Sequence, residues 1–436
     1  MNDERFELDD VFGVTRDLPL TYVARDNVDD VFLASLSRRQ HLVVFGSSKQ
    51  GKTSLRKHCL HDDAYVVVMC SNRWTRLDEL HTAVLKAAGY VIKQSSTRTA
   101  AGTHKVTAKV EGKAGLPFVA QGKVGGEGAY ERQAEDATTY APLELDPGDV
   151  NDIIAALAAI AFDKFVVLED FHYLPIATQR DFAVALKAFH ENSRLSFIVV
   201  GVWLDENRLI QLNGDLTERV VAVNADVWSA EELMRVISRG EELLNVQFRP
   251  YFKERVIDES FASVSVVQVA CHDACTHAGV LSTQTTLTPV GHDVNARETV
   301  RSVIEKQSAR YVSFLQRFAS GFEETKLDIY RWILLPVLMA KPGELRKGVS
   351  HAHIQRMVSG YHPFGGAVTA SSVTEALQST AALQVELGVK PIILDYDEST
   401  RRLNVVDRGF LIWLEAQDTH QLLIDTELPE YPQLGF

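Results

Sequence analysis

Short continuous apolar runs alternate along the chain with longer stretches that carry apolar residues at helical spacing. The runs are rich in Val, Ile and Phe, and they lie at residues 42–46, 65–70, 165–170, 196–202 and 220–224. A continuous apolar run indicates a strand that is covered on both faces, and strands that alternate with helices indicate a parallel sheet. The pattern therefore predicts an α/β fold with a parallel five-stranded sheet.

A glycine-rich segment at residues 94–145 interrupts this alternation. It is basic in its first half and acidic in its second half, and an unstructured loop of about 50 residues is uncommon inside a compact domain. The alternation of Val106, Ala108 and Val110 with polar residues predicts a hairpin within it. Two interpretations stay open: a surface insertion without fixed structure, or a segment that becomes ordered on contact with a neighbouring subunit or partner.

The chain becomes mainly helical after residue 226, and this change suggests the domain organisation. We expect an N-terminal leader at 1–40, a core at 41–226 and a helical lid at 227–292, in which the Gly- and Thr-rich residues 279–292 form a linker. The last unit, 293–436, contains three short helical patterns followed by two strand-like runs around a polar turn. This order predicts a winged-helix domain, with a packing of helices alone as the alternative.

The turn after the first apolar run combines two glycines with lysines and hydroxyl side chains. Residues 46–53 read G-S-S-K-Q-G-K-T, which matches G-x-x-x-x-G-K-[ST] between a strand and a helix. Gly46 and Gly51 allow successive N–H groups to point inward, and the helix start adds its positive dipole end. We expect Lys52 to contact the β- and γ-phosphates of a nucleotide and Thr53 to ligate Mg²⁺. The expected nucleotide-binding residues are Gly46, Ser47, Ser48, Lys49, Gln50, Gly51, Lys52, Thr53 and Ser54.

Two carboxylates follow the third apolar run. Glu169 and Asp170 lie at the carboxyl end of that predicted strand, as the acids of a Walker B strand do. The usual order is Asp for the metal and then Glu as the base, whereas this chain has Glu first. Either Glu169 binds the metal and Asp170 is the base, or the register is shifted by one residue.

Composition excludes several other classes of protein. Of the residues, 46% are hydrophobic and 24% charged, as in ordinary globular chains, and the net charge of −13 argues against a surface generally coated by nucleic acid. No apolar run approaches the ~20 residues that span a membrane, and the acidic residues 1–10 do not resemble a signal peptide. We expect a cytoplasmic protein without membrane contact. Cys271 and Cys275 lack partners at metal-binding spacing, so we expect them in the core.

Residues 22–53 and 165–174 resemble the entry segment, Walker A and Walker B motifs of the STAND and initiator-type branch of AAA+ ATPases. The resemblance implies an ATPase with bound ATP and Mg²⁺, a helical lid and a C-terminal winged helix. It implies that Arg25 lies near the base of the nucleotide. It also implies that Arg219, just before the fifth predicted strand, is an arginine finger for a neighbouring subunit. Compact ATPases of this kind are similar to components of bacterial antiviral defence systems.

The sequence departs from this family at its sensor positions. Gly201, Val202 and Trp203 follow the fourth predicted strand, where a polar sensor is usual. Only residues 205–208 offer polar substitutes, namely Asp205, Asn207 and Arg208, and the lid lacks an obvious sensor arginine. Developing charge on a transferred phosphoryl group would therefore need a cation from a second subunit.

These observations favour an ATP-driven switch that assembles into homo-oligomers and contacts a protein partner or effector through its C-terminal domain. The alternative is a DNA-binding initiator- or transposition-type regulatory ATPase. The expected recognition helix carries Glu375 and no Lys or Arg, and Arg401 and Arg402 of the wing are flanked by acids, so binding to nucleic acid is weakly supported. A kinase or GTPase fits worst, because the chain has no Asn-Lys-x-Asp guanine signature.

Overall fold

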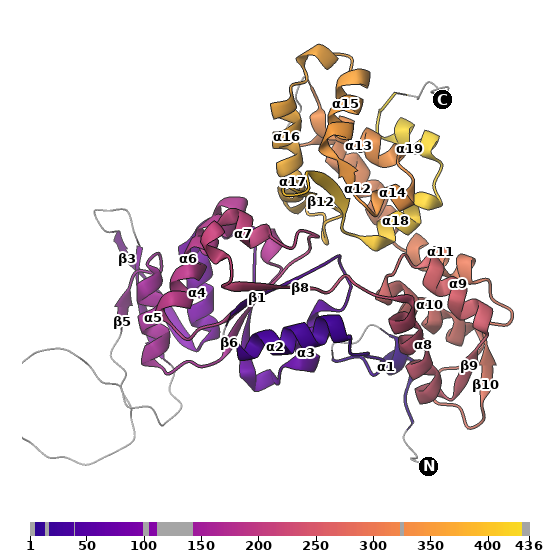
Figure 1. Cartoon of the computed structure of the whole chain (residues 1–436), viewed down its shortest axis with the longest axis horizontal. Helices are drawn as coiled ribbons and strands as arrows, with labels where there is room; N and C mark the ends of the chain where they lie inside the picture. The colour runs from indigo at the N-terminus through magenta and orange to yellow at the C-terminus, as the bar shows by residue number, and fades with distance from the viewer. Residues whose placement is uncertain are drawn as a thin grey trace, which may run out of the picture.

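The computed structural model describes residues 5–13, 17–38, 40–98, 104–110, 143–322 and 327–429. Figure 1 shows a core built around the central sheet, a group of helices beside it, and a C-terminal group of helices that sits above the junction of the two. Within the described ranges, no helix is long and apolar enough to cross a membrane.

The core contains the predicted parallel sheet. Its strands are β1 (His41–Phe45), β2 (Tyr65–Met69), β6 (Phe165–Glu169), β7 (Phe197–Val200) and β8 (Val220–Asn224), in the order β2-β6-β7-β1-β8. Every pairing between neighbours is parallel. The fold class expected from the apolar runs is therefore confirmed.

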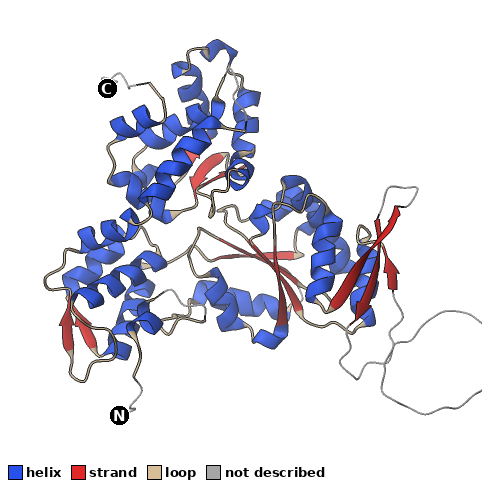
Figure 2. Cartoon of the chain, turned by 180° about the vertical axis from the view of Figure 1, so that it is seen from behind, coloured by secondary structure: helices blue, strands red, loops and turns tan. Residues whose placement is uncertain are grey.

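Helices cover both faces of the sheet, as Figure 2 shows. One layer is formed by α2 (Val31–Ser37) and α3 (Lys52–Cys59), and the other by α4 (Leu77–Ala87), α5 (Val150–Ala159) and α6 (Ile176–Asn192). In β1, Leu42 and Val44 pack with the first layer, whereas Val43 and Phe45 pack with the second. Successive strand residues point to opposite faces, so a strand with helices on both sides reads as an unbroken apolar run.

The glycine-rich segment contributes a second, antiparallel sheet. Its strands are β3 (Tyr90–Arg98), β4 (His104–Val110) and β5 (Leu143–Leu145). The pairing of β3 with β4 confirms the predicted hairpin. Residues 111–142, which hold most of the predicted insertion, lie outside the described residues, so its contact with a partner stays a prediction.

The helices beside the core are α8 (Ala230–Leu244), α9 (Pro250–Glu259), α10 (Val264–His277) and α11 (Ala296–Glu305). The expected linker at 279–292 is corrected, because it holds β10 (Thr288–Val290), which pairs in parallel with β9 (Val246–Phe248).

The leader also contributes a helix, α1 (Leu8–Phe12), that packs against α8 and α10. A Cβ at Gly240 of α8 would lie 2.0 Å from the Phe12 ring, so this contact requires glycine. Cys271 and Cys275 are fully buried in α10, as expected.

The C-terminal part begins with α12 (Ser308–Ser320). The three expected helical segments are α13 (Ile329–Met339), α15 (His351–Tyr361) and the pair α16 (Ala370–Gln378) and α17 (Thr380–Glu386). The expected strand-like runs form a hairpin of β12 (Leu394–Asp397) and β13 (Arg402–Val405), which β11 (Val349–Ser350) extends. This part also contains α14 (Pro342–Leu345), α18 (Arg408–Glu415) and α19 (Thr419–Asp425), whereas the short helix α7 (Arg208–Leu212) belongs to the core, between β7 and β8. The winged-helix assignment stays a prediction.

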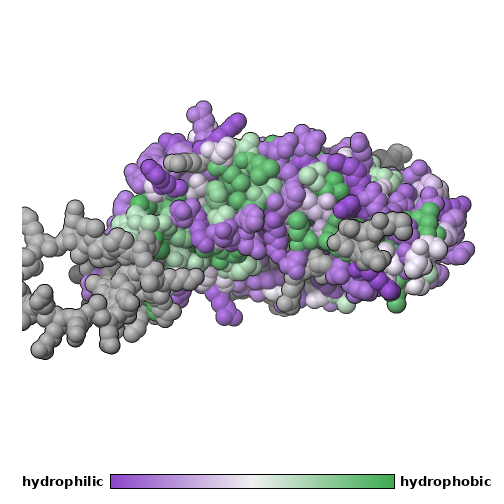
Figure 3. Space-filling model, turned by 90° about the horizontal axis from the view of Figure 1, so that it is seen from below, coloured by the Kyte–Doolittle hydropathy of each residue, from purple (hydrophilic) through white to green (hydrophobic). Residues whose placement is uncertain are grey.

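The face seen in Figure 3 is mainly hydrophilic, and its hydrophobic side chains gather in separate small areas. Such scattered apolar exposure is normal for a globular chain.

Candidate active site

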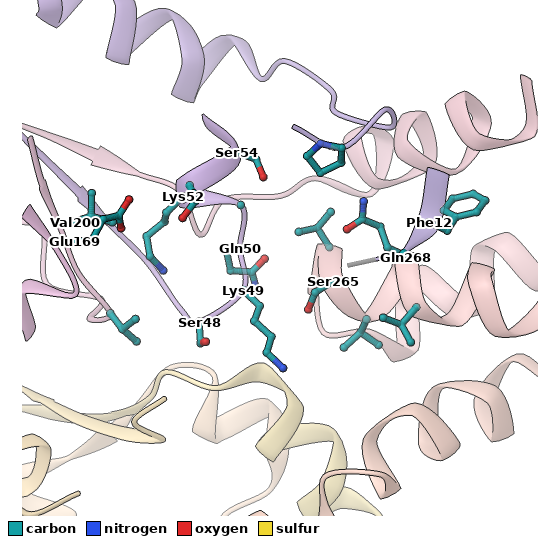
Figure 4. A pocket seen from close by; sticks show the side chains of 18 of the residues that line it. Phe12, Ser48, Lys49, Gln50, Lys52, Ser54, Glu169, Val200, Ser265 and Gln268 are labelled. Carbon is teal, nitrogen blue, oxygen red and sulfur yellow. The ribbon is translucent and has the colours of Figure 1, made fainter. Parts of the chain in front are cut away.

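A cavity of about 460 Å³ opens where the core meets the N-terminal segment and α10. Its walls come from the loop between β1 and α3, the carboxyl ends of β6 and β7, the first turns of α10, and two stretches of the leader. Figure 4 shows the loop at the centre, with Glu169 and Lys52 on one side and Ser265, Gln268 and Phe12 on the other. Ligands of parallel α/β sheets bind at the carboxyl ends of the strands, so this is the expected place for a site.

The loop after β1 has the backbone that the glycine pattern predicts. Gly46 has φ 141° and Gly51 has φ 83°, which are conformations that L-residues rarely adopt. A Cβ at Gly46 would also lie 2.9 Å from the backbone nitrogen of Asp226. The helix α3 begins at Lys52, directly after Gly51. The first-turn N–H groups of α3 are therefore available to an anion.

Lys52 folds back onto its own loop. Its Nζ donates to the carbonyl oxygens of Gly46, at 2.9 Å, and Ser47, at 2.6 Å. Burial lowers the pKa of Lys52 to about 8, and the nearby carboxylates of Asp226, Glu169 and Asp170 oppose this shift. The Lys52 ammonium is buried and bonded only to neutral carbonyl oxygens in these two hydrogen bonds. It would gain a stronger, charge-assisted contact by moving to a phosphate.

Both predicted acids line the cavity. Burial raises the pKa of the Glu169 carboxyl, and Arg56 opposes this by an ion pair in which Nε lies 3.3 Å from Oε1. Burial also raises the pKa of Asp170, against the opposing charge of Lys52. We did not predict Arg56 from the sequence. Arg56 lies four residues after Lys52, so both side chains are on one face of α3. This spacing is the sequence feature from which a role for Arg56 at the site could have been predicted.

The chemistry of the donors fits a magnesium-bound nucleotide. Thr53, Glu169 and Asp170 bring hydroxyl and carboxylate oxygens to one cavity, and such hard donors suit Mg²⁺. The Ser47 hydroxyl and both polar atoms of the Gln50 amide are buried without a hydrogen-bond partner among the described atoms. Buried polar groups are rarely left unpaired, so a polar ligand or a bound water at this loop would satisfy them.

The C-terminal domain contacts the loop directly, and no sequence pattern predicted this. The Ser48 N–H donates to the Val406 carbonyl at 2.9 Å. Arg408 forms an ion pair with Asp226, whose Oδ1 accepts from the Ser47 N–H at 2.9 Å. Asp226 therefore joins the phosphate loop to a side chain far along the sequence.

Two of the candidate sensor residues after β7, Asp205 and Arg208, contact the C-terminal domain, and none of the three candidates lines the cavity. Arg208 Nη1 lies 3.0 Å from both carboxylate oxygens of Asp395. Burial raises the pKa of Asp205 to about 6, and its Oδ1 lies 3.5 Å from the Ser399 hydroxyl. The sensor role expected for Asp205, Asn207 or Arg208 stays a prediction.

Arg25 and Arg219 both lie outside the cavity wall. Arg25 is fully buried, donates to the carbonyls of Ala225 and Val227, and stacks 4.2 Å from the Trp228 ring. Its contacts join the leader to the segment after β8. Arg219 precedes β8 and pairs with Glu191 at 2.8 Å while its side chain stays partly exposed. The roles expected for these two arginines stay predictions.

A parallel sheet in the order β2-β6-β7-β1-β8, with the glycine-rich loop after β1 and the acids after β6, is a P-loop core of AAA+-like topology. No protein-family model and no curated protein matches the chain. Similar solved structures include the Walker-type ATPase of Pyrococcus abyssi, with TM-score 0.48 and 11% identity over 93% of this chain and 99% of that chain. The Aeropyrum pernix ORC2 protein has TM-score 0.47 and 12% identity over 97% and 98%. The Thermotoga maritima RuvB motor has TM-score 0.36 and 14% identity over 88% and 92%.

Proposed function

We propose that this protein is an ATP-binding and ATP-hydrolysing switch. The observation that carries the proposal is the placement of Lys52, Thr53 and the acids Glu169 and Asp170 around one cavity beside a glycine-shaped phosphate loop. Positioning and electrostatic stabilisation are the main requirements of phosphoryl transfer. The cavity supplies a cation, a metal-binding hydroxyl and two carboxylates, which are the groups that this reaction needs.

Each of these residues has a proposed task. Lys52 turns from the Gly46 and Ser47 carbonyls to the phosphates, and the N–H groups of residues 49–54 surround them. Thr53 and Glu169 hold Mg²⁺, which neutralises phosphate charge when it is bound. Asp170 positions the attacking water and accepts its proton, because its carboxylate lines the cavity without an ion pair to any described residue and its pKa is raised.

The phosphate site is tested by Lys52→Ala, with Lys57→Ala on the same helix as the charge-matched control. A charge-assisted contact contributes about 1.5–3 kcal/mol, so we expect MgATP to bind about 10- to 100-fold more weakly to Lys52→Ala. Lys57 does not line the cavity, so its variant should bind like the wild type. Isothermal titration calorimetry measures both. If Lys52→Ala binds MgATP with near wild-type affinity, the proposed phosphate site is wrong.

We propose that the C-terminal domain responds to the nucleotide through its contacts with the loop. Val202, at the end of β7 and in the cavity wall, packs against Ile392 and Val406. Together with the Ser48 hydrogen bond and the Arg408–Asp226 ion pair, this places the domain against the residues that move when Lys52 turns. Nucleotide occupancy would then change the docking of the domain.

Arg408→Ala tests this docking, with Arg239→Ala as the control because the Arg239–Glu242 pair is exposed. Loss of one partner from a largely buried ion pair is destabilising. We expect the Arg408 variant to be more extended in small-angle scattering, whereas the Arg239 variant should match the wild type. An unchanged radius of gyration with and without MgATP in all three proteins would contradict a docked switch.

We propose further that the switch acts as a homo-oligomer in which Arg219 serves a neighbouring site. Within its own chain Arg219 contacts Glu191 and the Asp215 carbonyl and lies outside the cavity wall, so only a second subunit would use it. Arg219→Ala should keep ATP bound and lose turnover. Mixed with Lys52→Ala, it should regain some activity, since each variant retains the half that the other lacks. A mixture no more active than its components would contradict the finger role.

A DNA-binding regulator is the alternative, and the wing contacts argue against it. Arg402 donates to the carbonyls of Lys347 and Gly348, and Arg401 contacts His351. Both arginines are thus used inside the domain, which favours a protein partner or effector at this surface. Salt-dependent retention on duplex DNA would reverse that preference.

The biological setting that we propose, from the family resemblance of the sequence, is antiviral defence in the bacterial cytoplasm. Cells that carry the wild-type gene should then resist phage better than cells that carry Lys52→Ala. Equal phage titres on the two strains would remove this setting and leave the ATPase proposal intact.

A further inference from the structure

One end of the cavity is apolar and lies away from the acids. Pro19 of the leader lines this end, together with Val264, Val266 and Val269 of the first turns of α10, whereas the nearby Phe12 ring packs against Gly240. Apolar side chains on several sides suit a flat aromatic ring. This end is therefore suited to the base of a nucleotide whose phosphates lie at the loop.

The Gln268 amide is a polar group in this mainly apolar part of the wall, which also includes Ser265. Figure 4 shows Gln268 extending from α10 toward the phosphate loop, with its oxygen on the cavity side. Its Nε2 donates to the Thr21 hydroxyl oxygen at 3.0 Å. Among the described residues none donates to Oε1 of Gln268.

The orientation of this amide follows from the direction of two hydrogen bonds. The Thr21 hydroxyl donates to the Val11 carbonyl at 3.1 Å, and a carbonyl oxygen can only accept. A hydroxyl has a single proton, so the Thr21 oxygen can only accept from Gln268. A flipped amide would place two acceptors against each other. The Gln268 amide therefore keeps its nitrogen on Thr21 and offers its oxygen to the cavity.

We propose that Gln268 selects adenine over guanine, and that Thr21 is the positioning residue that fixes the direction of its amide. Adenine carries a 6-amino group that can donate to Oε1, whereas guanine has an acceptor oxygen at that position. The inference rests on the proposed function and names the base that the same cavity prefers. A site with a fixed acceptor gains one hydrogen bond with adenine and opposes guanine by repulsion between lone pairs.

The test compares the dissociation constants of MgATP and MgGTP for the full chain by calorimetry. We expect the wild type to prefer MgATP by at least about tenfold, because adenine gains a hydrogen bond to Oε1 whereas guanine meets a repelling acceptor there. Thr21→Val removes the hydroxyl at nearly constant size and frees the amide to turn. In this variant the dissociation constants of MgATP and MgGTP should differ by no more than about threefold. The change should come from tighter binding of MgGTP. Thr21→Ser keeps the hydroxyl and should keep the preference.

A second comparison holds even where Thr21→Val fails to fold. Purine riboside triphosphate lacks the 6-amino group, so it should bind the wild type about tenfold more weakly than ATP. In Gln268→Leu the two nucleotides should bind alike. An ATP preference that is unchanged in both variants, or a wild type without preference, would overturn the role of Gln268. Loss of all nucleotide binding, or binding insensitive to Lys52→Ala, would instead contradict the proposed function.

Discussion

The two ends of the cavity are built in different ways. The phosphate end is made by consecutive residues, 46–54, together with Glu169 and Asp170 at the end of a neighbouring strand. The base end is made by the leader and α10, and the Thr21–Gln268 hydrogen bond joins residues that are 247 positions apart. The phosphate end therefore depends on local backbone geometry, whereas the proposed base end exists only while the leader and α10 are packed together.

This difference suggests how binding and lid position are coupled. A phosphate can bind to the loop in any arrangement of the lid, because the loop carries its own N–H groups and Lys52. A base gains contacts only when α10 and the leader are in place. ATP would thus stabilise the packed arrangement by its differential contacts with it, which is the only way that a ligand can shift such an equilibrium.

The largest effect is expected at the phosphate end, in catalysis. Asp170→Asn removes the proposed base and should lower ATP turnover by about 10²- to 10⁴-fold while MgATP still binds. Glu169→Gln should instead weaken the part of binding that depends on Mg²⁺. The exposed Asp163, on the loop before β6, gives the control Asp163→Asn. A phosphate-release assay measures turnover, and calorimetry measures binding. If the effects of the two acid variants are interchanged, Glu169 is the base and Asp170 the metal ligand.

The next effect is the pH dependence of ATP binding. The pKa of Lys52 is lowered to about 8 in the free protein, so above pH 8 the free lysine is neutral and must take up a proton to bind phosphate. Affinity should fall above pH 8 by up to about tenfold per pH unit, with proton uptake on binding. Calorimetry in buffers of different ionisation enthalpy counts the protons. A flat affinity up to pH 9.5 would place the pKa of free Lys52 above that range.

A smaller effect is expected at the base end, and it should spare the phosphates. Val264→Ala removes two carbon atoms from the cavity wall and should weaken MgATP by about 4- to 15-fold, since each buried methylene contributes about 0.8 kcal/mol. Binding of inorganic tripolyphosphate should not change. Val267→Ala is the matched control, because Val267 is buried on the same helix but does not line the cavity. Equal loss for ATP and tripolyphosphate would mean that Val264 acts through the fold and not through the base.

The contrast between the ends also explains what the sequence could predict. The parallel sheet, the phosphate loop and the acids follow from continuous runs and a contiguous motif, because local backbone geometry determines them. Gln268, Thr21 and the Arg408–Asp226 ion pair come from distant segments, and no spacing rule places them together. The strand β10 was missed for the same reason, since a three-residue strand is set by its partner β9 and not by its own pattern.

Hydrogen exchange of the full chain tests most directly whether the two ends form one site. We expect MgATP to slow exchange in three separate segments: the leader at 17–22, the loop at 46–54 and the first turns of α10 at 264–269. Magnesium tripolyphosphate should slow exchange at 46–54 alone, and Lys52→Ala should reduce both responses. Slowing by MgATP that is confined to 46–54 and equal to that by tripolyphosphate would contradict a nucleotide site shared between the loop, the leader and the lid.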